Sequence, residues 1–363
     1  MKILNVVGAR PNFMKIAAIL KAFKQRPSIQ ALLLHTGQHS GREMSASFFK
    51  ELNLPRPDFY LDIGRGNATT QMARVMVRFE RVLEHERPDL VLVVGDVTST
   101  LACALVAQRH GVPLAHVEAG LRSFDRTMPE EINRRLTDAL SDYLFTTCED
   151  ANHHLIEEGI PAERIHFVGN VMADTLLSNL NQITQSGILD QLGLNGDQYV
   201  VITLHRPSNV DDPRRLAVLC RALSKIQKAA RIIFPIHPRT RSRLIRFGLM
   251  EKLIRYPGLV TLRPLGYLDF IQLLRHARVV LTDSGGVQEE ATILGIPCLT
   301  LRGNTERPVT IWNGSNHLVG RQSVEIVEET LRRLGKRRRR YPIPPLWDGY
   351  AAKRIVSVLT RRP

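Results

Sequence analysis

The 363-residue sequence is poor in cysteine and in aromatic residues, and it has no long apolar run. Its four cysteines form no CxxC pair, which indicates neither a zinc site nor a disulfide framework and fits a cytoplasmic protein best. No apolar stretch approaches the roughly 20 residues that a membrane-spanning helix needs, so we expect no membrane partner. The apolar residues 3–9 are interrupted by Asn5 and are interpreted as a buried strand, not a signal peptide.

Cofactor and metal motifs are absent as well. No GxGxxG follows a strand, and GRGNAT at residues 64–69 lacks the third glycine, so a dinucleotide cofactor has no support. Neither the phosphate-binding motif GxxxxGK[ST] nor the zinc motif HExxH occurs. We therefore expect no metal and no bound cofactor.

One sign of charge dominates. The 50 Lys and Arg residues exceed the 35 Asp and Glu residues by 15, which favours an anionic partner, either a phosphorylated small molecule or a nucleic acid. The densest basic run, residues 336–340, precedes a proline-rich connection and lacks the interleaved aromatic residues that single-stranded nucleic acid would stack on. We interpret this run as a solvated linker and expect no nucleic-acid partner. A basic nucleic-acid-binding or scaffold protein is the alternative from a different functional class.

Short apolar runs alternate with longer amphipathic stretches, the pattern of repeated βα units around a parallel sheet. The runs expected as strands are residues 3–7, 31–35, 90–95, 113–117, 143–147 and 165–168, and then 199–204, 231–235, 259–262, 279–282 and 298–301. The pattern restarts after Gly169, which predicts two Rossmann-like α/β domains at residues 1–169 and 170–346. A helix at about residues 347–363 could pack back on the first domain. Two such domains facing each other predict a ligand in the cleft between them.

Three acidic side chains stand at the end of an apolar run or at the start of a helix: Asp96 in VVGDVTST, Glu118 in HVEAGLRS and Glu130 in TMPEEINR. Because ligands of open α/β sheets bind beyond the carboxyl ends of the strands, this placement suggests proton-transfer chemistry. Two of the acids also have a structural alternative. Asp96 could cap the next helix, and Glu130 could stabilise the first turn of its own helix. Glu118 has no obvious helix to cap.

The segment LTDSGGVQEEA predicts an anion site. An apolar strand leads into Ser284, Gly285 and Gly286, whose small side chains let the backbone approach a ligand, and free N–H groups at the following helix start suit a diphosphate. Glu290, one helical turn further on, could accept hydrogen bonds from ribose hydroxyls. The structural alternative is a tight turn with a helix cap.

Basic residues follow three other strand-like runs. They are Arg10 and Lys15 in GARPNFMK, His205 and Arg206 in HRPSN, and His237 and Arg239 in HPRTR. Guanidinium, ammonium and imidazole groups can donate to phosphate, to a leaving group or to the uridine, whereas a metal site would need more ligands. A single histidine at a strand end is also commonly structural.

These motifs occur in the order GARPNFMK, TGQH, VVGDVTST, HVEAGLRSFDRTMPEEINR, HRPSNVDD, HPRTR, DSGGVQEEA and TERP. From residue 2 to about residue 320 the chain resembles the non-hydrolysing UDP-N-acetylglucosamine 2-epimerases. The resemblance implies two Rossmann-like domains in the glycosyltransferase-B arrangement and a homodimer. It also implies interconversion of UDP-GlcNAc and UDP-ManNAc without added NAD or metal, through elimination of UDP, a 2-acetamidoglucal intermediate and re-addition of UDP.

Carried over position by position, the resemblance implies roles for the residues above. The catalytic carboxylates are Asp96, Glu118 and Glu130, with Arg10, Lys15 and His205 also in the active site. The UDP-binding loop and ribose contact are Ser284, Gly285, Gly286 and Glu290, with Arg206, His237 and Arg239 in support. One position departs, because the family commonly has Glu where this chain has Ser208. Gln38 and His39 match a segment that regulated members use for a second UDP-GlcNAc, but the surrounding loop differs too much to predict regulation.

Two enzymatic alternatives stay open. A glycosyltransferase with the same two-domain architecture would bind the same nucleotide sugar, since fold alone does not decide function. An epimerase could also act on a modified UDP-sugar, such as a diacetamido uronate.

Overall fold

The computed structural model describes residues 1–38, 48–64, 66–196, 198–320, 322–336 and 340–361. His39 and residues 337–339 of the basic run lie outside them. Packing divides the chain into two units: unit 1 comprises Met1–Ser178 and Pro345–Pro363, and unit 2 comprises Asn179–Pro344. The expected boundary after Gly169 lies just before α7 (Val171–Ser178), which packs against α1 (Arg10–Phe23) within unit 1.

Unit 1 is built on a parallel seven-stranded sheet in the order β3-β2-β1-β4-β5-β6-β7. Its strands are β1 (Lys2–Val7), β2 (Gln30–His35), β3 (Phe59–Tyr60), β4 (Leu90–Val94), β5 (Leu114–Ala119), β6 (Tyr143–Thr146) and β7 (Ile165–Phe167). All five residues of β4 are buried, as expected for a strand covered on both faces. The order reverses between β1 and β4, which defines the switch point where such sheets bind ligands.

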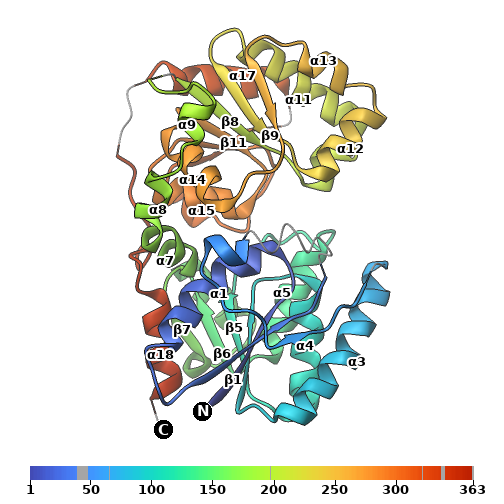
Figure 1. Cartoon of the computed structure of the whole chain (residues 1–363), viewed down its shortest axis with the longest axis vertical. Helices are drawn as coiled ribbons and strands as arrows, with labels where there is room; N and C mark the ends of the chain where they lie inside the picture. The colour runs from blue at the N-terminus through green and yellow to red at the C-terminus, as the bar shows by residue number, and fades with distance from the viewer. Residues whose placement is uncertain (39–47, 65, 197, 321, 337–339, 362–363) are drawn as a thin grey trace. The chain divides into compact units, whose positions relative to one another are not determined.

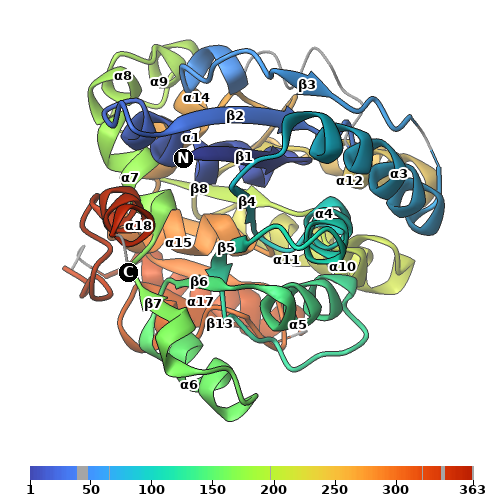
Figure 2. The same cartoon turned by 90° about the horizontal axis from the view of Figure 1, so that it is seen from below.

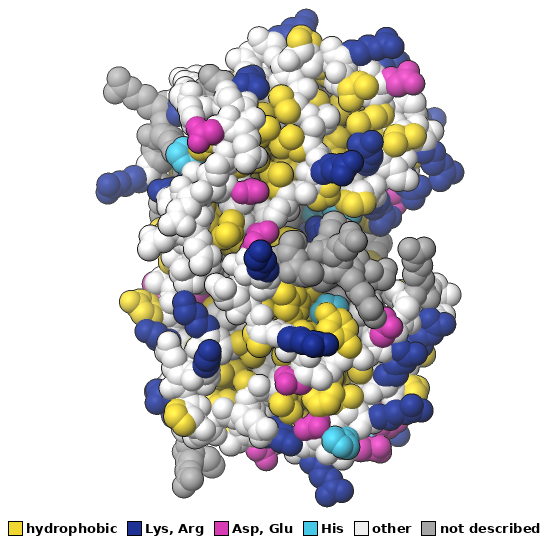
Figure 3. All heavy atoms as spheres, viewed as in Figure 1, with side chains coloured by type: hydrophobic (Ala, Val, Ile, Leu, Met, Phe, Trp, Pro, Cys, Tyr) yellow, Lys and Arg dark blue, Asp and Glu magenta, His cyan; other side chains and the backbone are white. Residues whose placement is uncertain are grey.

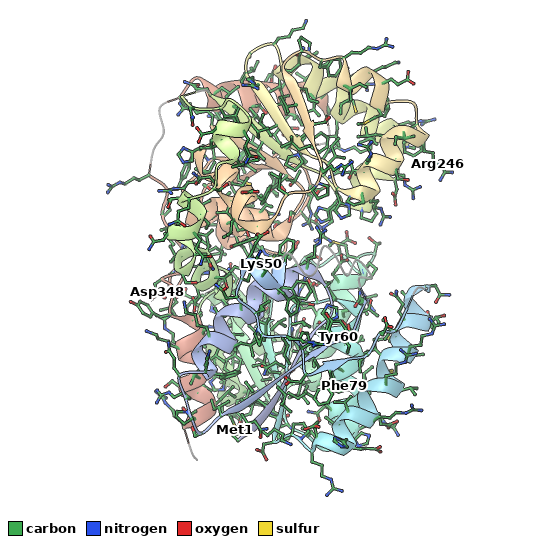
Figure 4. The ribbon with its side chains drawn as sticks, viewed as in Figure 1. Met1, Lys50, Tyr60, Phe79, Arg246 and Asp348 are labelled. Carbon is green, nitrogen blue, oxygen red and sulfur yellow. The ribbon has the colours of Figure 1, made fainter. Side chains whose placement is uncertain are left out.

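Helices cover both faces of the unit 1 sheet (Figures 1 and 2). On one face α3 (Ala68–Glu86), α4 (Thr98–Arg109) and α5 (Pro129–Leu140) pack side by side, and on the other α1 packs with α7 and α18 (Ala351–Thr360). The helix α6 (Glu149–Glu157) and a short 3₁₀ turn (Ala162–Arg164) connect β6 to β7. Phe79, labelled in Figure 4, is fully buried between α3 and the apolar residues of the sheet.

The C-terminal segment belongs to unit 1. The Trp347 ring N–H donates to the Thr147 carbonyl oxygen at 2.9 Å. The buried Asp174 carboxylate on α7 accepts from the N–H groups of Ala351 and Ala352 at 3.1 and 2.7 Å, which fixes the first turn of α18. Gly169 has φ +88°, and a Cβ there would lie 2.0 Å from the Leu346 carbonyl oxygen, so only glycine fits this crossing.

Unit 2 repeats the architecture with a parallel six-stranded sheet in the order β10-β9-β8-β11-β12-β13, whose switch point lies between β8 and β11. Its strands are β8 (Tyr199–Thr203), β9 (Arg231–Pro235), β10 (Leu259–Leu262), β11 (Val279–Thr282), β12 (Cys298–Thr300) and β13 (Asn316–Leu318). Its helices are α8 (Leu180–Thr184), α9 (Ile188–Gln191), α10 (Pro207–Val210), α11 (Pro213–Ile226), α12 (Pro238–Arg246), α13 (Met250–Ile254), α14 (Tyr267–His276), α15 (Gly285–Ile293), α16 (Val309–Trp312) and α17 (Ser323–Leu334).

Within unit 2, α11 packs against α17, and α14 packs against α8, α9 and α15. The core between the sheet and α11 is aliphatic, with Val200, Ile202 and Leu219 almost fully buried. The prediction of two Rossmann-like parallel α/β units is confirmed. The strands β3 and β13 were missed, because two and three residues with mixed polarity give no apolar run.

The charge excess is unequally divided. Unit 1 contains 24 Lys and Arg residues against 22 Asp and Glu, a net +2, whereas unit 2 contains 26 against 13, a net +13. Basic side chains accordingly outnumber acidic ones on the unit 2 surface in the upper part of Figure 3. The positive charge that favours the predicted anionic partner therefore lies mainly on unit 2. Among the described residues, no helix is both long and apolar enough to cross a membrane.

Candidate active site

The loop after β1 is packed tightly against the end of β4. The Asn12 side-chain oxygen accepts from the N–H groups of Gly8 and Ala9, both at 3.0 Å, and its amide donates to the Val94 carbonyl oxygen at 2.9 Å. A Cβ on Gly8 would lie 2.0 Å from the Ser99 hydroxyl, so the loop leaves no room for a side chain. Asn12 thereby ties the two strand ends of the switch point together.

Lys15 and Glu118 form a buried ion pair at this switch point. Lys15 lies one turn into α1, and Glu118 lies in β5, next to β4 in the sheet. Gly95 makes room for the pair, because a Cβ there would stand 2.8 Å from the Lys15 ammonium. Glu118 has φ +74°, a left-handed conformation that non-glycine residues rarely adopt and that is concentrated at functional sites. A strained, buried carboxylate is thus aimed at Lys15.

Asp96 follows β4 and is held by α5. Its carboxylate pairs with Arg134, and its carbonyl oxygen accepts from the Asn133 amide at 2.9 Å. The N-cap of α4 is Val97, and the Ser99 N–H in its first turn donates to the Gln38 side-chain oxygen at 2.9 Å, so Asp96 is not the N-cap residue of that helix. The Asp96 side chain instead lies at the carboxyl end of the strand.

The two glutamates that begin α5 differ in environment. Glu131 is buried; its carboxylate accepts from the Ser123 N–H and hydroxyl at 2.8 and 2.9 Å and pairs with Arg134 at 2.8 Å. Glu130 is only partly buried in the same helical turn. The buried glutamate therefore braces the arginine that contacts Asp96, and the sequence motif did not distinguish the two positions.

A second buried network of hydrogen bonds and ion pairs contacts the Gly95 carbonyl oxygen. The His116 ring contacts the Gly95 carbonyl oxygen at 2.8 Å through Nε2 and the Asp138 carboxylate at 2.6 Å through Nδ1. Asp138 also binds the Arg122 guanidinium at 2.7 Å. Burial by itself would raise the pKa of Asp138, but His116 and Arg122 outweigh it and hold that pKa below its ordinary value. Sequence analysis missed this network, which fixes the ends of β4 and β5.

Arg10 is the first residue of α1 and follows the end of β1. Its guanidinium lies over the Phe48 ring, 5.4 Å from the centroid, and partial burial lowers its pKa from the ordinary value. Within unit 1 the structure therefore gathers Arg10, Lys15, Asp96 and Glu118 around the β1, β4 and β5 ends, with Glu130 on the helix that holds Asp96.

In unit 2 the corresponding switch point contains His205, Arg206 and Asp283. Asp283 directly follows β11 and is completely buried. Its carboxylate accepts from the N–H groups of His205 and Arg206 at 3.0 Å each, and the His205 ring nitrogen Nδ1 lies 3.0 Å away. The loops after β8 and β11 are thereby joined through one side chain.

The Ser284–Gly285–Gly286 segment begins α15 at this point. The Ser284 N–H donates to the Thr282 hydroxyl at 3.0 Å, and the Ser284 side chain caps no N–H group among the described residues. A Cβ on Gly285 would lie 2.3 Å from the Arg307 guanidinium, so a larger residue here would displace the Arg307 side chain. The helix start fits the predicted anion site, because its N–H groups are of the kind that bind phosphate.

Buried ion pairs lie beneath that helix start. Glu306 pairs with Arg302 at 2.8 Å and with Arg307 at 2.5 Å, and it lies 3.5 Å from Arg206. Arg307 also pairs with Glu289 at 2.9 Å. These residues bring three guanidinium groups together with two carboxylates beside the loop, where Asp283 adds a third carboxylate.

Glu290 is buried on α15. Burial, followed by the neighbouring Glu289, raises the pKa of Glu290 to about 8. The buried Tyr267 hydroxyl lies close enough for Glu290 to contribute to raising the tyrosine pKa, after burial itself. A carboxyl group that is neutral at neutral pH can donate one hydrogen bond as well as accept others.

His237 and Arg239 begin α12. The His237 ring lies 5.7 Å from that of His205, and its Nδ1 accepts from the Arg239 N–H at 3.2 Å. The Arg239 side chain pairs with Asp211, and this pairing is the main cause that lowers the pKa of Asp211 to about 2. His237 therefore lies with His205, whereas the Arg239 guanidinium is engaged by an acid that sequence analysis did not consider. In the described part of the chain, no group of three or more His, Cys, Asp and Glu side chains is arranged to hold a metal ion.

Comparison with known proteins finds relatives over nearly the whole chain. A model of the UDP-N-acetylglucosamine 2-epimerase family matches residues 21–360. The UDP-N-acetylglucosamine 2-epimerase of Methanocaldococcus jannaschii is 43% identical over 99% of both chains. The UDP-2,3-diacetamido-2,3-dideoxy-D-glucuronate 2-epimerase of Pseudomonas aeruginosa is also 43% identical, over 93% of both chains.

Solved structures give the same result. The M. jannaschii UDP-GlcNAc 2-epimerase in complex with UDP-GlcNAc and UDP superimposes with a TM-score of 0.93 and 99% coverage of both chains. The Neisseria meningitidis UDP-GlcNAc 2-epimerase bound to UDP-GlcNAc is 30% identical, with a TM-score of 0.90 over 100% of both chains. The protein belongs to the UDP-N-acetylglucosamine 2-epimerase family of isomerases.

Proposed function

We propose that the protein interconverts UDP-N-acetylglucosamine and UDP-N-acetylmannosamine by inverting C2 of the sugar. The observation that carries the proposal is the meeting of Asp96, Glu118 and Lys15 at the β1/β4 switch point, with Glu118 held in a strained conformation. Family membership and the UDP-GlcNAc complexes of two relatives support a UDP-sugar as the ligand.

The proposed chemistry starts with departure of UDP. The C2 hydrogen is weakly acidic, because the N-acetyl carbonyl is not conjugated with that carbon. When the C1–O bond breaks, its electron pair stays on the β-phosphate oxygen and positive charge develops at the ring, which acidifies the C2 hydrogen. A carboxylate then takes the proton, and a C1–C2 double bond forms in 2-acetamidoglucal. A proton added to the opposite face of C2 and return of the UDP oxygen to C1 complete the inversion.

Asp96, Glu118 and Glu130 are the proposed acid and base groups. Arg134 holds Asp96, and Lys15 holds Glu118, so two of the three carboxylates have a fixed orientation. A positioned general acid or base contributes about 10² to 10⁴-fold. The remaining acceleration comes from stabilising the charge on departing UDP, which is the proposed task of Arg10, Lys15 and His205.

Unit 2 supplies the proposed nucleotide contacts. The Ser284 hydroxyl and the Gly285 and Gly286 N–H groups bind the diphosphate, and Glu290 binds the ribose, beside the buried arginines and within a unit of net charge +13. Arg206, His237 and Arg239 support the site. This charge pattern suits a ligand with two negative phosphates.

Proton NMR of the purified protein with UDP-GlcNAc in deuterated water tests the proposal. The expected result is UDP-ManNAc with deuterium at C2. The recovered UDP-GlcNAc should also contain deuterium at C2, because the reaction is reversible. The Asp96→Asn variant should lose at least about 10²-fold in kcat. Product with hydrogen retained at C2 would rule out the proton exchange. Transfer of the sugar to an added acceptor would identify the protein as a glycosyltransferase. Release of free ManNAc and UDP would identify it as a hydrolysing enzyme.

A second candidate substrate is a UDP-diacetamido uronate. The observation that favours it is the P. aeruginosa relative, which is as similar in sequence as the M. jannaschii enzyme. Measuring kcat/KM for both UDP-sugars with one preparation decides between them, and the higher value identifies the preferred substrate.

The proposal includes a homodimer, which the resemblance to the family implies, and a cytoplasmic location, which the four separate cysteines fit best. Light scattering at several protein concentrations tests the assembly, and a mass of one 41.0 kDa chain throughout would refute it.

A further inference from the structure

One buried carboxylate in unit 2 organises the whole loop that carries His205. Asp283 is 0% exposed, whereas the His205 side chain is 36% exposed. The carboxylate accepts from the His205 N–H at 3.0 Å, the Arg206 N–H at 3.0 Å and the Asn209 amide at 3.1 Å. The imidazole nitrogen Nδ1 lies 3.0 Å from the same carboxylate. Backbone and ring of His205 are therefore fixed by a single group.

The ionisation state of Asp283 determines which nitrogen of the His205 ring carries the hydrogen. Burial would raise the pKa of Asp283, but the His205 ring, the Asn209 amide and the Arg206 N–H outweigh burial and hold this pKa below its ordinary value. An ionised carboxylate only accepts hydrogen bonds, so Nδ1 of His205 carries a hydrogen. The other nitrogen, Nε2, is left for a ligand on the more exposed edge of the ring.

The neighbouring His237 has the opposite tautomer to the one inferred for His205. His237, from the loop between β9 and α12, accepts at Nδ1 from the Arg239 N–H, so its own hydrogen is on Nε2 when the ring is neutral. The two rings lie 5.7 Å apart between centroids. Asp283 contacts the His205 ring, and the guanidinium of the adjacent Arg206 lies 3.5 Å from Glu306.

Asp283 also joins the two loops of the switch point. It immediately precedes Ser284, whereas His205 follows β8, the strand that pairs with β11. The Asn209 amide that contacts Asp283 also donates to the Leu301 carbonyl oxygen at 2.9 Å, which extends the connection to the end of β12. A change at Asp283 is therefore transmitted to His205 without removing any group proposed to contact the diphosphate.

We propose that Asp283 is the positioning residue of His205: it holds the hydrogen on Nδ1 and presents Nε2 to the β-phosphate oxygen of departing UDP. This inference rests on the proposed function. When the C1–O bond breaks, the electron pair passes to that oxygen, and the imidazolium form of His205 donates from Nε2 to it. The negative charge of Asp283 compensates the imidazolium. On return, the oxygen re-forms the bond to C1 and Nε2 keeps its proton.

The test compares Asp283→Asn with Asn209→Ser. The first variant keeps the shape but replaces one acceptor oxygen by an NH2 group, which cannot accept a hydrogen bond, and removes the negative charge that faces the His205 ring. The second removes the Asn209 hydrogen bonds to the same carboxylate, to the Leu301 carbonyl oxygen and from Arg215, and leaves the His205 contact with Asp283 in place. For Asp283→Asn we expect kcat to fall by about 10²-fold or more, a loss typical of one general acid or base, while the Kd for UDP changes less than about threefold. Asn209→Ser should keep kcat within about threefold.

Two further measurements separate positioning from general loosening. In a His205→Asn background, Asp283→Asn should have little further effect on kcat, because the two residues act as one unit. An equal additional loss in that background, or a loss of UDP binding parallel to kcat, would overturn the proposal.

Nitrogen-15 NMR of the ligand-free wild-type protein tests the pairing independently of activity and of the folding of any variant. The expected spectrum shows His205 with its hydrogen on Nδ1 in the neutral form, and the opposite tautomer would overturn the proposal. If this tautomer is found but no UDP-sugar is epimerised, the proposed function is refuted, whereas the Asp283–His205 pairing still holds.

Discussion

Glu290 gives the sharpest prediction for stability, because its carboxyl group is buried next to another glutamate. A pKa raised from 4.5 to about 8 corresponds to about 5 kcal/mol between the two protonation states. In the unfolded chain this group ionises above pH 4.5, whereas in the folded chain it keeps its proton up to about pH 8. The unfolded state therefore binds fewer protons in this window, and the contribution of Glu290 to the unfolding free energy falls as pH rises from 4.5 to 8.

The variant Glu290→Gln removes this dependence, because an amide does not ionise. Urea unfolding of the ligand-free wild type and variant at pH 5, 7 and 9 measures the effect in the transition that unfolds unit 2. Relative to the wild type, the variant should gain stability with rising pH, by up to about 5 kcal/mol between pH 5 and 9. The exposed Glu84→Gln, on α3 of unit 1, is the control and should follow the wild-type curve. Parallel curves for wild type and Glu290→Gln would refute the reasoning.

Three further predictions concern other parts of the molecule. Asp138→Asn should cost about 1 to 3 kcal/mol in unfolding free energy, because it removes the buried carboxylate that Arg122 and His116 share and leaves Arg122 with Glu158 as its acidic partner. In the wild type this contribution should be lost only as pH falls through the lowered pKa of Asp138, below its ordinary 3.8, which urea unfolding between pH 7 and 3 would show. Gly169→Ala should lower Tm by several degrees more than Gly159→Ala, since both glycines have positive φ but only Gly169 would place its Cβ against a carbonyl oxygen, and equal shifts by calorimetry would contradict this. The kcat/KM for a UDP-sugar should fall as salt rises from 0.01 to 0.15 M, because unit 2 attracts the diphosphate through its net charge, and a salt-independent kcat/KM would contradict it.

Much of the fold could be predicted from the sequence because the central strands are buried on both faces. β4 and β8 are nearly continuous apolar runs, and such runs bounded by polar residues give a clear signal. The short edge strands β3 and β13 gave no such signal. Glu118 was conspicuous in the sequence because no helix start follows it, whereas its positive φ and its ion pair with Lys15 were not indicated by any local pattern.

The partners of the site residues could not be predicted. Arg134 reaches Asp96 because of how α5 lies against the end of β4, a tertiary fact that no local pattern encodes. The adjacent Glu130 and Glu131 look alike in sequence, and only packing buries the second. Asp283 was read as part of a glycine-containing turn, because its contact with His205 joins residues 78 positions apart.

The chain leaves unit 1 at Ser178 and re-enters it at Pro345, so unit 2 is an insertion within the other unit. Residues 179–344 are one uninterrupted stretch that a single excision would release, whereas unit 1 is completed only by α18, which follows unit 2 in the chain. A frameshift or stop codon near residue 344 would thus leave unit 2 whole. The damage would fall on the half that carries Asp96, by uncovering the side of α1 and α7 where Ile355 and Val356 are buried.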